Sequence, residues 1–294
     1  MKKDFVSLKD LNKKEIEAIF KKADLLKKTK SAPLKGKSLA LIFQKPSMRT
    51  RVSFEVGMFQ LGGQSINLGP EDIQLGVREK VSDIAQVLSR YLDGIVARTF
   101  SHEDVVLLAS HASIPVINGL SDAEHPCQAL ADLYTVRNYF GDLRKVKIAY
   151  VGDGNNVCNS LMHGAAVVGA TLSIAAPKNY EPPRESVRNN IFVFNDPKEA
   201  VRGADVVYTD VWTSMGQEKE KEERLQAFRG FQVNESLMSL AKPNAKFMHC
   251  LPAHRGEEVS ESVLEGKHSI VLDQAENRLH VQKAILVMLL GKKS

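Results

Sequence analysis

Apolar residues recur along the chain in two alternating patterns, which predict helices and short strands. Residues 12–30 carry apolar side chains at helical spacing, with Lys and Glu at most other positions, and predict an amphipathic helix. Pro33 and Gly36 then interrupt it. Short apolar runs alternate with helical stretches from there on, and the pattern restarts after a polar connector at 140–145. Strands that alternate with helices in this way indicate parallel sheets covered by helices on both faces.

Each half of the chain has its own set of predicted elements. The first half is expected to hold strands at 38–43, 64–68, 94–97 and 115–117, and helices near 50–61, 79–91, 103–111 and 126–139. The second half is expected to hold strands at 146–151, 171–175, 191–194, 205–209, 246–250 and 269–272, a helix from near Val157, and a last helix over about 276–290. The stretch between Pro183 and Ile191 is too short for a full connecting helix. We therefore predict an α/β protein of two domains.

The composition is that of an ordinary globular protein, with 43% hydrophobic and 26% charged residues among 294. This length suits two domains of about 150 residues each. The formal net charge of +5 is uneven, because residues 1–45 hold thirteen lysines and five acids while the remainder is net −3. A nucleic-acid enzyme would carry basic charge on its binding face, so the distribution argues against that class and favours a solvated Lys-rich helix face.

The three cysteines, Cys127, Cys158 and Cys250, are an odd number without a CxxC pair. They give neither a disulfide framework nor the ligand spacing of a zinc knuckle. Residues 1–30 lack the apolar core of a signal peptide. No window approaches about 18 consecutive apolar residues, the length that a membrane helix requires. We expect a soluble, cytoplasmic protein with no membrane or nucleic-acid partner.

Ligands of open parallel sheets bind beyond the carboxyl ends of the strands, so the polar residues that follow each strand are the candidate site. After strand 38–43 the chain reads Ser47-Met48-Arg49-Thr50-Arg51 and enters a helix. Ser47 is a natural N-cap, and the free amides of a first helical turn attract anions. With two arginines and two hydroxyl groups, this segment predicts a phosphate site, although a capped helix with surface arginines would have the same sequence.

The next two strands of the first half are also followed by polar residues. Arg98 follows strand 94–97, where either a ligand contact or an ordinary salt bridge would explain it. His125 and Gln128 follow strand 115–117 and open another helix. A single histidine is more often structural, but this one lies at a second helix start with other polar groups nearby.

In the second half, Gly152–Asn156 resembles part of a dinucleotide-binding glycine loop. The third glycine is absent and no acid clearly ends the next strand, so the amides of Asn155 and Asn156 are a better match to another polar ligand. Asp210 ends strand 205–209 and precedes a loop with Gly216 and a charged stretch, which is either a mobile lid or a solvated loop.

Two further candidates lie near the end of the chain. Cys250, at the end of strand 246–250, could contact a substrate, although an inert buried cysteine is the commoner case. Arg278 adds a cation at the start of the last helix.

Together these segments resemble the aspartate/ornithine carbamoyltransferase family, and its ornithine branch most closely. The resemblance runs from Phe5 to the last helix and depends on six motifs in family order. They are SMRTR (47–51), HPCQ (125–128), DGNN (153–156), DVWTSMGQE (210–218), HCLP (249–252) and ENR (276–278). This chain departs from the family pattern at position 48, where it has Met and many members carry Thr.

The resemblance implies transfer of a carbamoyl group from carbamoyl phosphate to the δ-amine of L-ornithine, giving citrulline in arginine metabolism, with no cofactor and no metal. It implies a carbamoyl-phosphate-binding domain at 1–140, an ornithine-binding domain at 141–276, and a C-terminal helix, 277–294, that returns to the first domain. It also implies a homotrimer, or a multiple of trimers, in which Gln74 is lent to a neighbouring subunit's site.

Site roles follow from the same resemblance. Carbamoyl phosphate would contact Ser47, Met48, Arg49, Thr50, Gln74, Arg98, His125, Gln128, Cys250, Leu251 and Arg278. Arg98, His125 and Cys250 would be the catalytic residues. L-ornithine would contact Asn156, Asp210, Ser214 and Met215. Three alternatives remain: an aspartate carbamoyltransferase, a carbamoyltransferase for putrescine or N-acetylornithine, and a non-catalytic protein that binds carbamoyl phosphate.

Overall fold

The structure, a computed structural model, describes residues 2–184, 187–213 and 218–291. The chain forms two compact units, one of Met1–Ala131 with Glu276–Ser294 and the other of Asp132–Ala275. The unit boundaries fall inside two helices, α5 (Pro126–Phe140) and α11 (Val271–Leu290). Among the described residues, no helix combines the length and apolar character that a membrane crossing requires.

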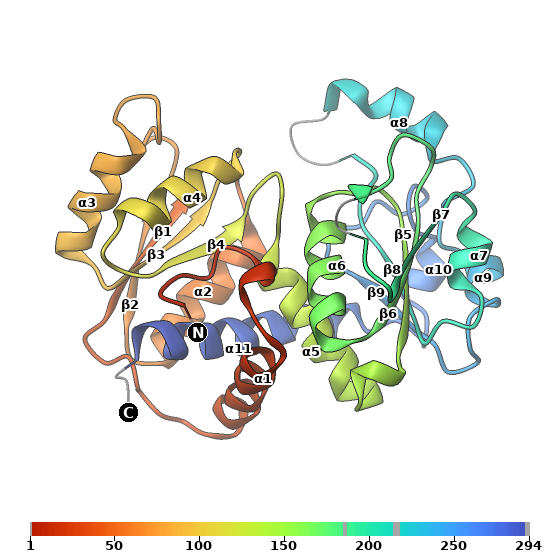
Figure 1. Ribbon diagram of the computed structural model, residues 1–294, viewed down its shortest axis with the longest axis horizontal. Coiled ribbons are helices and arrows are strands. Elements are labelled where there is room, and N and C mark those ends of the chain that lie inside the picture. Colours follow the sequence, from red (N-terminus) through yellow and green to blue (C-terminus); the bar gives the residue numbers. More distant parts are fainter. Residues whose placement is uncertain (1, 185–186, 214–217, 292–294) are drawn as a thin grey trace. The chain divides into compact units, whose positions relative to one another are not determined.

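The first unit contains a four-stranded parallel sheet of order β2-β1-β3-β4 (Figure 1). Its strands are β1 (Ser38–Phe43), β2 (Gln64–Leu68), β3 (Gly94–Arg98) and β4 (Val116–Leu120). Its helices, besides parts of α5 and α11, are η1 (Leu8–Asp10), α1 (Lys13–Lys28), α2 (Met48–Gln60), α3 (Val81–Tyr91) and α4 (His102–His111). One face of the sheet packs apolar side chains against α3 and α4, in a core that includes Ile42, Ile95, Ile84 and Leu108.

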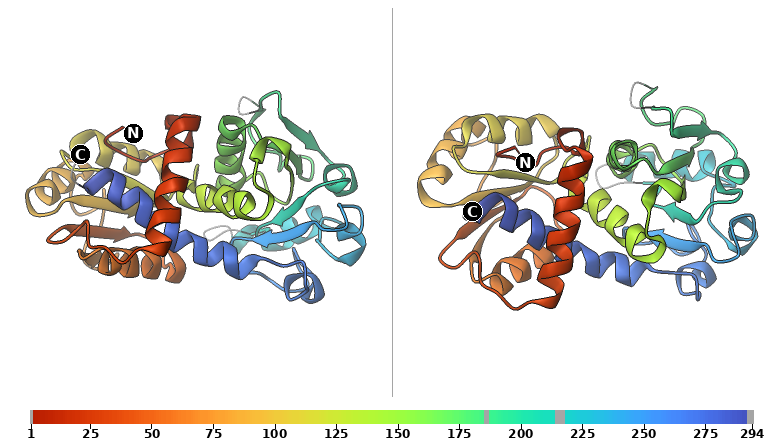
Figure 2. Two further views of the ribbon diagram at one scale, coloured as in Figure 1. Left: turned by 90° about the horizontal axis from the view of Figure 1, so that it is seen from below. Right: turned by 60° about the horizontal axis from the view of Figure 1, so that its bottom comes forward.

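Helices α2 and α11 cover the other face of this sheet. Gly57 of α2 lies against Leu279 and Leu286 of α11, and Leu290 approaches Gly94 of β3. Helix α1 begins with a complete capping box at Asn12 and buries the predicted apolar stripe. It crosses α11, where Lys27 lies 3.3 Å from Glu276 (Figure 2). The C-terminal helix therefore packs onto the first unit, as predicted.

The second unit contains a five-stranded parallel sheet of order β7-β6-β5-β8-β9. Its strands are β5 (Lys147–Val151), β6 (Thr171–Ala175), β7 (Ile191–Phe194), β8 (Val206–Thr209) and β9 (Lys246–His249). Its helices, besides part of α5 and the start of α11, include η2 (Leu143–Lys145), α6 (Asn156–Val168), α7 (Pro197–Val201), η4 (Glu218–Glu220), α8 (Lys221–Ala227), α9 (Glu235–Met238) and α10 (Glu261–Leu264). Buried residues of β5, β8 and β9 form one core with α7, α10 and the aromatic residues Trp212 and Phe228.

Two predicted elements near the C-terminus are wrong. The strand expected at 269–272 is absent: Ser269 forms one isolated bridge to Phe247, and α11 begins at Val271. The last helix therefore starts five residues before the predicted position of 276. A short apolar run is compatible with either a strand or a first helical turn, and here the run continues into a long helix.

The other nine strands are confirmed, within one residue at each end except that β4 runs on to Leu120. The connection from β6 to β7 contains no α-helix in its described parts, 176–184 and 187–190, which agrees with the short length noted in the sequence.

Candidate active site

Helix α2 begins at the predicted phosphate segment. Ser47 has extended backbone angles, and its hydroxyl accepts a hydrogen bond from the Thr50 amide at 3.4 Å. The amides of Met48 and Arg49 belong to the first helical turn, where helix geometry provides no carbonyl partner. Met48 is 70% exposed, so this turn faces solvent, while Thr50 is buried. The helix start therefore has the features that can bind an anion, with partial positive charge from the helix dipole.

Arg278 joins this turn to two other helices of the first unit. It is the eighth residue of α11 and is buried, which corrects the predicted position at the helix start. Its guanidinium donates to Gln128 Oε1 at 2.5 Å and to Thr50 Oγ1 at 3.0 Å. The predicted residues Thr50, Gln128 and Arg278 therefore meet in one hydrogen-bonded group, although they lie far apart in the sequence.

His125 lies directly before Pro126, the first residue of α5, and is 6% exposed. Its carbonyl accepts from the amides of Gln128 and Ala129, which fixes its backbone as the start of the helix. The pKa of His125 lies well below its usual value, first because of burial and then because Arg278, Arg98 and Arg49 repel a positive charge. The imidazole is therefore neutral at physiological pH. His125 is thus a neutral hydrogen-bonding group whose pKa three arginines help to lower.

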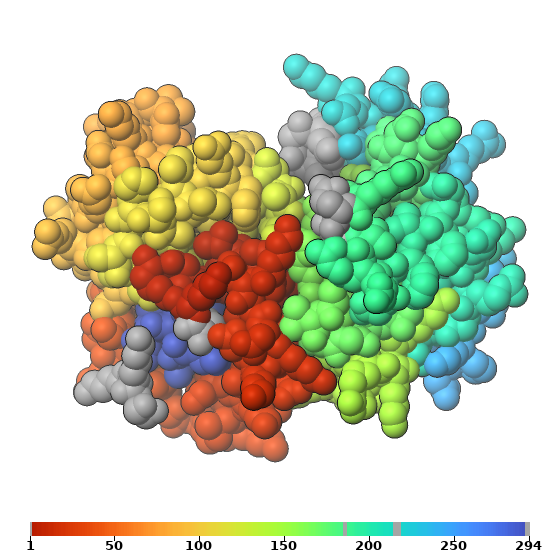
Figure 3. All heavy atoms as spheres, viewed as in Figure 1, coloured from red at the N-terminus to blue at the C-terminus, as the bar shows by residue number. Residues whose placement is uncertain are grey.

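A buried carboxyl next to His125 fixes the loop that carries it. Glu124 accepts a hydrogen bond from the Ser7 hydroxyl at 2.6 Å, and burial raises the pKa of its carboxyl. Phe5 pairs with Val116 and Asn118 of β4, so the N-terminal segment lies along the edge of the sheet. In Figure 3 this segment, in red, forms part of the surface next to the segment in yellow. Sequence reasoning missed Glu124, because no local pattern links residue 7 to residue 124.

Gln74 lies apart from this cluster. It is exposed in the turn between β2 and α3, and its carbonyl accepts from the amides of Val77 and Arg78. Its side chain forms no hydrogen bond with the Arg278 cluster among the described residues.

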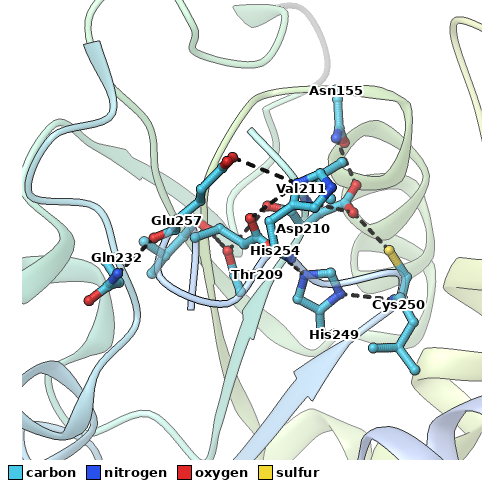
Figure 4. Close-up of polar contacts among 12 residues, drawn as sticks. Asn155, Thr209, Asp210, Val211, Gln232, His249, Cys250, His254 and Glu257 are labelled. Carbon is cyan, nitrogen blue, oxygen red and sulfur yellow. Dashed lines mark hydrogen bonds and ion pairs between the residues drawn. The ribbon is translucent and has the colours of Figure 1, made fainter. Parts of the chain in front are cut away.

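In the second unit, Asp210 follows β8 and is 5% exposed. Its carboxylate accepts from Asn155 Nδ2 at 2.8 Å, from its neighbour's amide, Val211 N, at 2.8 Å, and from Cys250 Sγ at 2.9 Å (Figure 4). Asn155 also caps α6, because its side-chain oxygen accepts from the amides of Val157 and Cys158. The motifs DGNN, DVWT and HCLP thus converge on one carboxylate. Asn155 is thus part of this group, while the predicted Asn156 is the first residue of α6.

Cys250 has a protonated thiol in this setting. Burial raises its pKa well above the usual value, and the adjacent Asp210 charge raises it further. Cys250 and the half-buried Leu251 follow β9, as predicted.

His249 and Glu258 fix the backbone at this point. His249 Nδ1 accepts from the Leu251 amide at 2.9 Å, and its Nε2 lies 3.1 Å from Glu258 Oε1. This assigns the imidazole proton to Nε2. Leu251 has a positive φ of 58°, which is uncommon outside glycine and frequent at functional sites. The sequence analysis did not select this His–Glu pair, although the histidine belongs to the HCLP motif.

The charged stretch after Asp210 is only partly solvated. Arg224 is 6% exposed, and its guanidinium contacts Asp153 at 2.9 Å, Glu220 at 2.9 Å and the Trp212 carbonyl at 3.0 Å. It therefore ties α8 to the DGNN loop. The predicted residues Ser214 and Met215, and Gly216 of the predicted lid, lie outside the described residues.

The glycine loop after β5 is filled by the chain itself. A Cβ atom on Gly154 would lie 2.3 Å from Pro182 N, and the Gly154 amide donates to the Tyr180 carbonyl. Close packing of 180–182 thus accounts for this glycine, and it agrees with the choice against a dinucleotide.

Comparisons with known proteins agree with this geometry. The family description "Aspartate/ornithine carbamoyltransferase, carbamoyl-P binding domain" matches residues 3–138, and "Aspartate/ornithine carbamoyltransferase, Asp/Orn binding domain" matches residues 144–289. The chain is 52% identical to an ornithine carbamoyltransferase of Methanoculleus marisnigri, covering 99% of this chain and 98% of that one.

Two solved structures complete the comparison. An ornithine carbamoyltransferase from Pyrococcus furiosus is 50% identical, with a TM-score of 0.96 over 99% of this chain and 98% of that one. An acetylornithine transcarbamylase complexed with acetylcitrulline is 34% identical, with a TM-score of 0.88 over 98% of this chain and 99% of that one. This chain belongs to the aspartate/ornithine carbamoyltransferase family.

Proposed function

We propose that this protein transfers the carbamoyl group of carbamoyl phosphate to the δ-amine of L-ornithine, giving L-citrulline and phosphate in arginine metabolism. The observation that carries the proposal is the set of three arginines around the neutral imidazole of His125. Such a set matches a phosphate dianion and the oxyanion that forms when an amine attacks a carbonyl. Family membership supports the same reaction.

The first unit supplies the residues for carbamoyl phosphate. The amides of residues 47–50 and the Arg49 guanidinium hold the phosphate. Arg98, His125 and the Thr50 hydroxyl polarise the carbonyl, with the neutral imidazole acting as a hydrogen-bond donor. Gln128 contacts the carbamoyl amide, and Arg278 holds both Gln128 and Thr50 in place. Cys250 and Leu251, which belong to the second unit, are the remaining residues proposed to contact carbamoyl phosphate.

The second unit supplies the residues for L-ornithine. The Asp210 carboxylate binds the positively charged α-amino group, and Asn156 binds the α-carboxylate side of the amino acid. Ser214 and Met215 are the other residues proposed to contact L-ornithine. Cys250, which donates to Asp210, adjoins the side-chain amine.

The δ-amine must lose a proton before it attacks, because a free alkylamine has a pKa of about 10.4. A closed pocket near the arginines favours the neutral amine. Phosphate then leaves with its charge already matched by Arg49 and the helix start. Catalysis would consist of positioning and electrostatic stabilisation.

An amine panel distinguishes this reaction from its rivals. The purified protein should form citrulline from carbamoyl phosphate and L-ornithine, and should be far less active with N-acetyl-L-ornithine, putrescine or L-aspartate. The physical reason is the buried Asp210, which can bind the free α-ammonium group of ornithine while the δ-amine reacts. That α-ammonium is acetylated in N-acetyl-L-ornithine and absent from putrescine, and in L-aspartate it is the only amine that could react. Product from aspartate or putrescine without citrulline would overturn the substrate assignment, and binding of carbamoyl phosphate without any product would favour a non-catalytic protein.

We also propose a homotrimer in which Gln74 enters the site of a neighbouring subunit. Exposed apolar side chains support an interface on the first unit, because Met48, Val52 and Phe59 form a stripe on α2 with exposures of 70%, 49% and 80%. Val77, close to Gln74 in the same turn, is 84% exposed.

Hybrid enzymes test the lent residue. A trimer made only of Gln74→Ala chains, or only of Arg98→Ala chains, should have no active site. Mixed trimers would contain some sites with Gln74 from one subunit and Arg98 from the other, and these should regain activity. Light scattering gives the subunit number, and mixed trimers without recovered activity would refute a shared site.

We assign residues 1–140 and helix 277–294 to the carbamoyl-phosphate-binding domain, and 141–276 to the ornithine-binding domain. The division of the chain into compact units and the change of family description between 138 and 144 support this assignment. We place the enzyme in the cytoplasm, where its three free cysteines would remain reduced.

A further inference from the structure

A tight turn in the second unit brings three potential metal ligands together. The His254 carbonyl accepts from the Glu257 amide at 3.0 Å, and Gly256, the third residue of this turn, has φ of +87°. A type II turn requires a positive φ at this position, so the glycine allows the chain to fold back. Gln232 Nε2 donates to the carbonyls of Gly256 and Glu257 at 2.8 and 3.0 Å and braces the turn (Figure 4).

The three side chains that meet are those of His254, Glu257 and Glu258. His254 Nδ1 lies 3.7 Å from Glu257 Oε2 and 3.9 Å from Glu258 Oε2, and one ligand atom of each residue falls within 4.8 Å of the others. A tetrahedral zinc ion with bonds of about 2.0–2.1 Å holds its ligand atoms about 3.3 Å apart. A shift of about half an ångström would bring His254 Nδ1 to this distance from both glutamates, and one oxygen of each glutamate lies within 4.8 Å of the other. The His254 and Glu257 side chains, 46% and 24% exposed, are free enough to make it.

Glu258 provides an independent reason to expect a cation. Its side chain is fully buried. Oε1 contacts His249 Nε2 at 3.1 Å and accepts from the His254 amide at 2.5 Å. Oε2 accepts no hydrogen bond from any residue that the structure describes, and it faces His254 Nδ1. A buried carboxylate oxygen without a partner is costly, and a metal ion would satisfy it.

An ordinary ion-pair cluster is the competing explanation. The contacts of His254 with both glutamates are longer than a hydrogen bond, so an imidazolium would not satisfy Glu258 Oε2 at this geometry. Lys221 lies 3.2 Å from Glu257 Oε1, so its ammonium group contacts the other oxygen of that carboxylate. The oxygens nearest to His254 therefore remain available to a dication.

We propose that His254, Glu257 and Glu258 form a binding site for a divalent transition-metal ion of the zinc class. One imidazole nitrogen and two carboxylates suit such an ion better than Mg²⁺ or Ca²⁺, which prefer oxygen ligands alone. Water completes the coordination from the exposed side. The site is distinct from the nearby Asp210, His249 and Cys250, because both ring nitrogens of His249 already have partners. The proposal is independent of the transfer reaction.

Zinc titration of the full-length protein without a polyhistidine tag tests the site. The Cys250→Ser background removes the thiol, the strongest rival ligand. Calorimetry should show one Zn²⁺ per chain in this background. His254→Ala and Glu257→Gln should each weaken binding by at least about 10-fold, the smaller end of the range for losing even a residue that only supports a ligand. Glu261→Gln is the matched control, because its carboxylate is 72% exposed and lies outside the group.

Co²⁺ spectra supply a second measurement. Ligation by nitrogen and oxygen gives visible d–d bands without the near-ultraviolet charge-transfer band of a thiolate. The proposal predicts these d–d bands in the Cys250→Ser background and their loss in His254→Ala. Three results would overturn it: no Zn²⁺ binding in that background, equal binding by His254→Ala and the control, or a Co²⁺ spectrum that depends only on Cys250.

Discussion

Replacing Asp210 by asparagine should separate the binding of the two substrates. The carboxylate accepts hydrogen bonds from Asn155, Val211 and Cys250. An asparagine can keep the oxygen that faces Val211 and Cys250, but its NH₂ group would then face the NH₂ group of Asn155. Asn155 cannot turn its amide around without losing the cap of α6, since its oxygen accepts from two amides there. The variant therefore loses the charge and creates one donor–donor contact.

The size of the effect follows from the loss of the charged hydrogen-bond partner that is proposed for the α-amino group of ornithine. A hydrogen bond to a charged group contributes about 1.5–3 kcal/mol, so kcat/KM for L-ornithine should fall about 10- to 150-fold in Asp210→Asn. The donor–donor contact adds to this loss. Carbamoyl phosphate affinity should change little, because its phosphate and carbonyl contacts are proposed for the first unit.

Steady-state citrulline formation measures the first quantity, and calorimetry with carbamoyl phosphate alone measures the second. Asp205→Asn is the matched control: Asp205 directly precedes β8 as Asp210 directly follows it, and it pairs with Lys242 at 2.7 Å. For the control, kcat/KM for L-ornithine and the affinity for carbamoyl phosphate should both stay within about twofold of the unmodified enzyme. This is the size of effect expected for the loss of an ion pair whose lysine is half exposed. Equal losses of affinity for both substrates would refute the division of roles between the units.

Three further predictions concern the charged and titratable groups of the two halves. The raised pKa of Cys250 should make its alkylation by iodoacetamide slow at mildly alkaline pH and faster in Asp210→Asn, as timed mass spectrometry would show; equal rates would contradict the effect of the carboxylate. Arg224→Met should lower the free energy of unfolding in urea by about 3–5 kcal/mol, because it leaves the carboxylate of Asp153 buried and unpaired, and adding Asp153→Asn should restore part of it. The lowered pKa of His125 should leave kcat/KM for carbamoyl phosphate without an inflection near pH 6.5. The stability linked to this group should be complete above about pH 6.5 and decline at lower pH, where only the unfolded chain binds the proton; an inflection near pH 6.5 would show that the imidazole titrates normally.

The sequence predicted the order of elements because strand and helix patterns are local. Every polar segment chosen at a strand end lies at the carboxyl end of a parallel strand, where neighbouring strands bring distant residues together. The error at 269–272 has the same local origin, since a run of three apolar residues fits a strand and a first helical turn equally well. Motif order allowed the family to be identified, but it could not place Arg278 in the middle of a helix.

Contacts between distant side chains were beyond local reasoning. Arg278 and Thr50 are 228 positions apart, and Ser7 and Glu124 are 117 apart. Whether such a group is paired depends on its burial. The periodicity of a sequence does not reveal the burial of a single charged residue. Arg224 shows the consequence, because it lies in a run of charges that reads as solvated and yet is buried against Asp153. By contrast, the turn that joins His254 to Glu257 had a visible signal in the Arg-Gly-Glu-Glu sequence after His254.

Each unit holds one buried titratable group that its charged neighbours keep neutral. In the first unit, burial and three arginines keep His125 neutral, so that it can donate a hydrogen bond without competing with them for the phosphate charge. In the second unit, burial and the Asp210 carboxylate keep the Cys250 thiol protonated. A protonated thiol is a poor nucleophile, so Cys250 would not compete with the substrate amine for the carbonyl in the proposed reaction. In the proposed reaction, the charges around Cys250 would therefore suppress the reactivity of its thiol, and the arginines near His125 would stabilise the oxyanion.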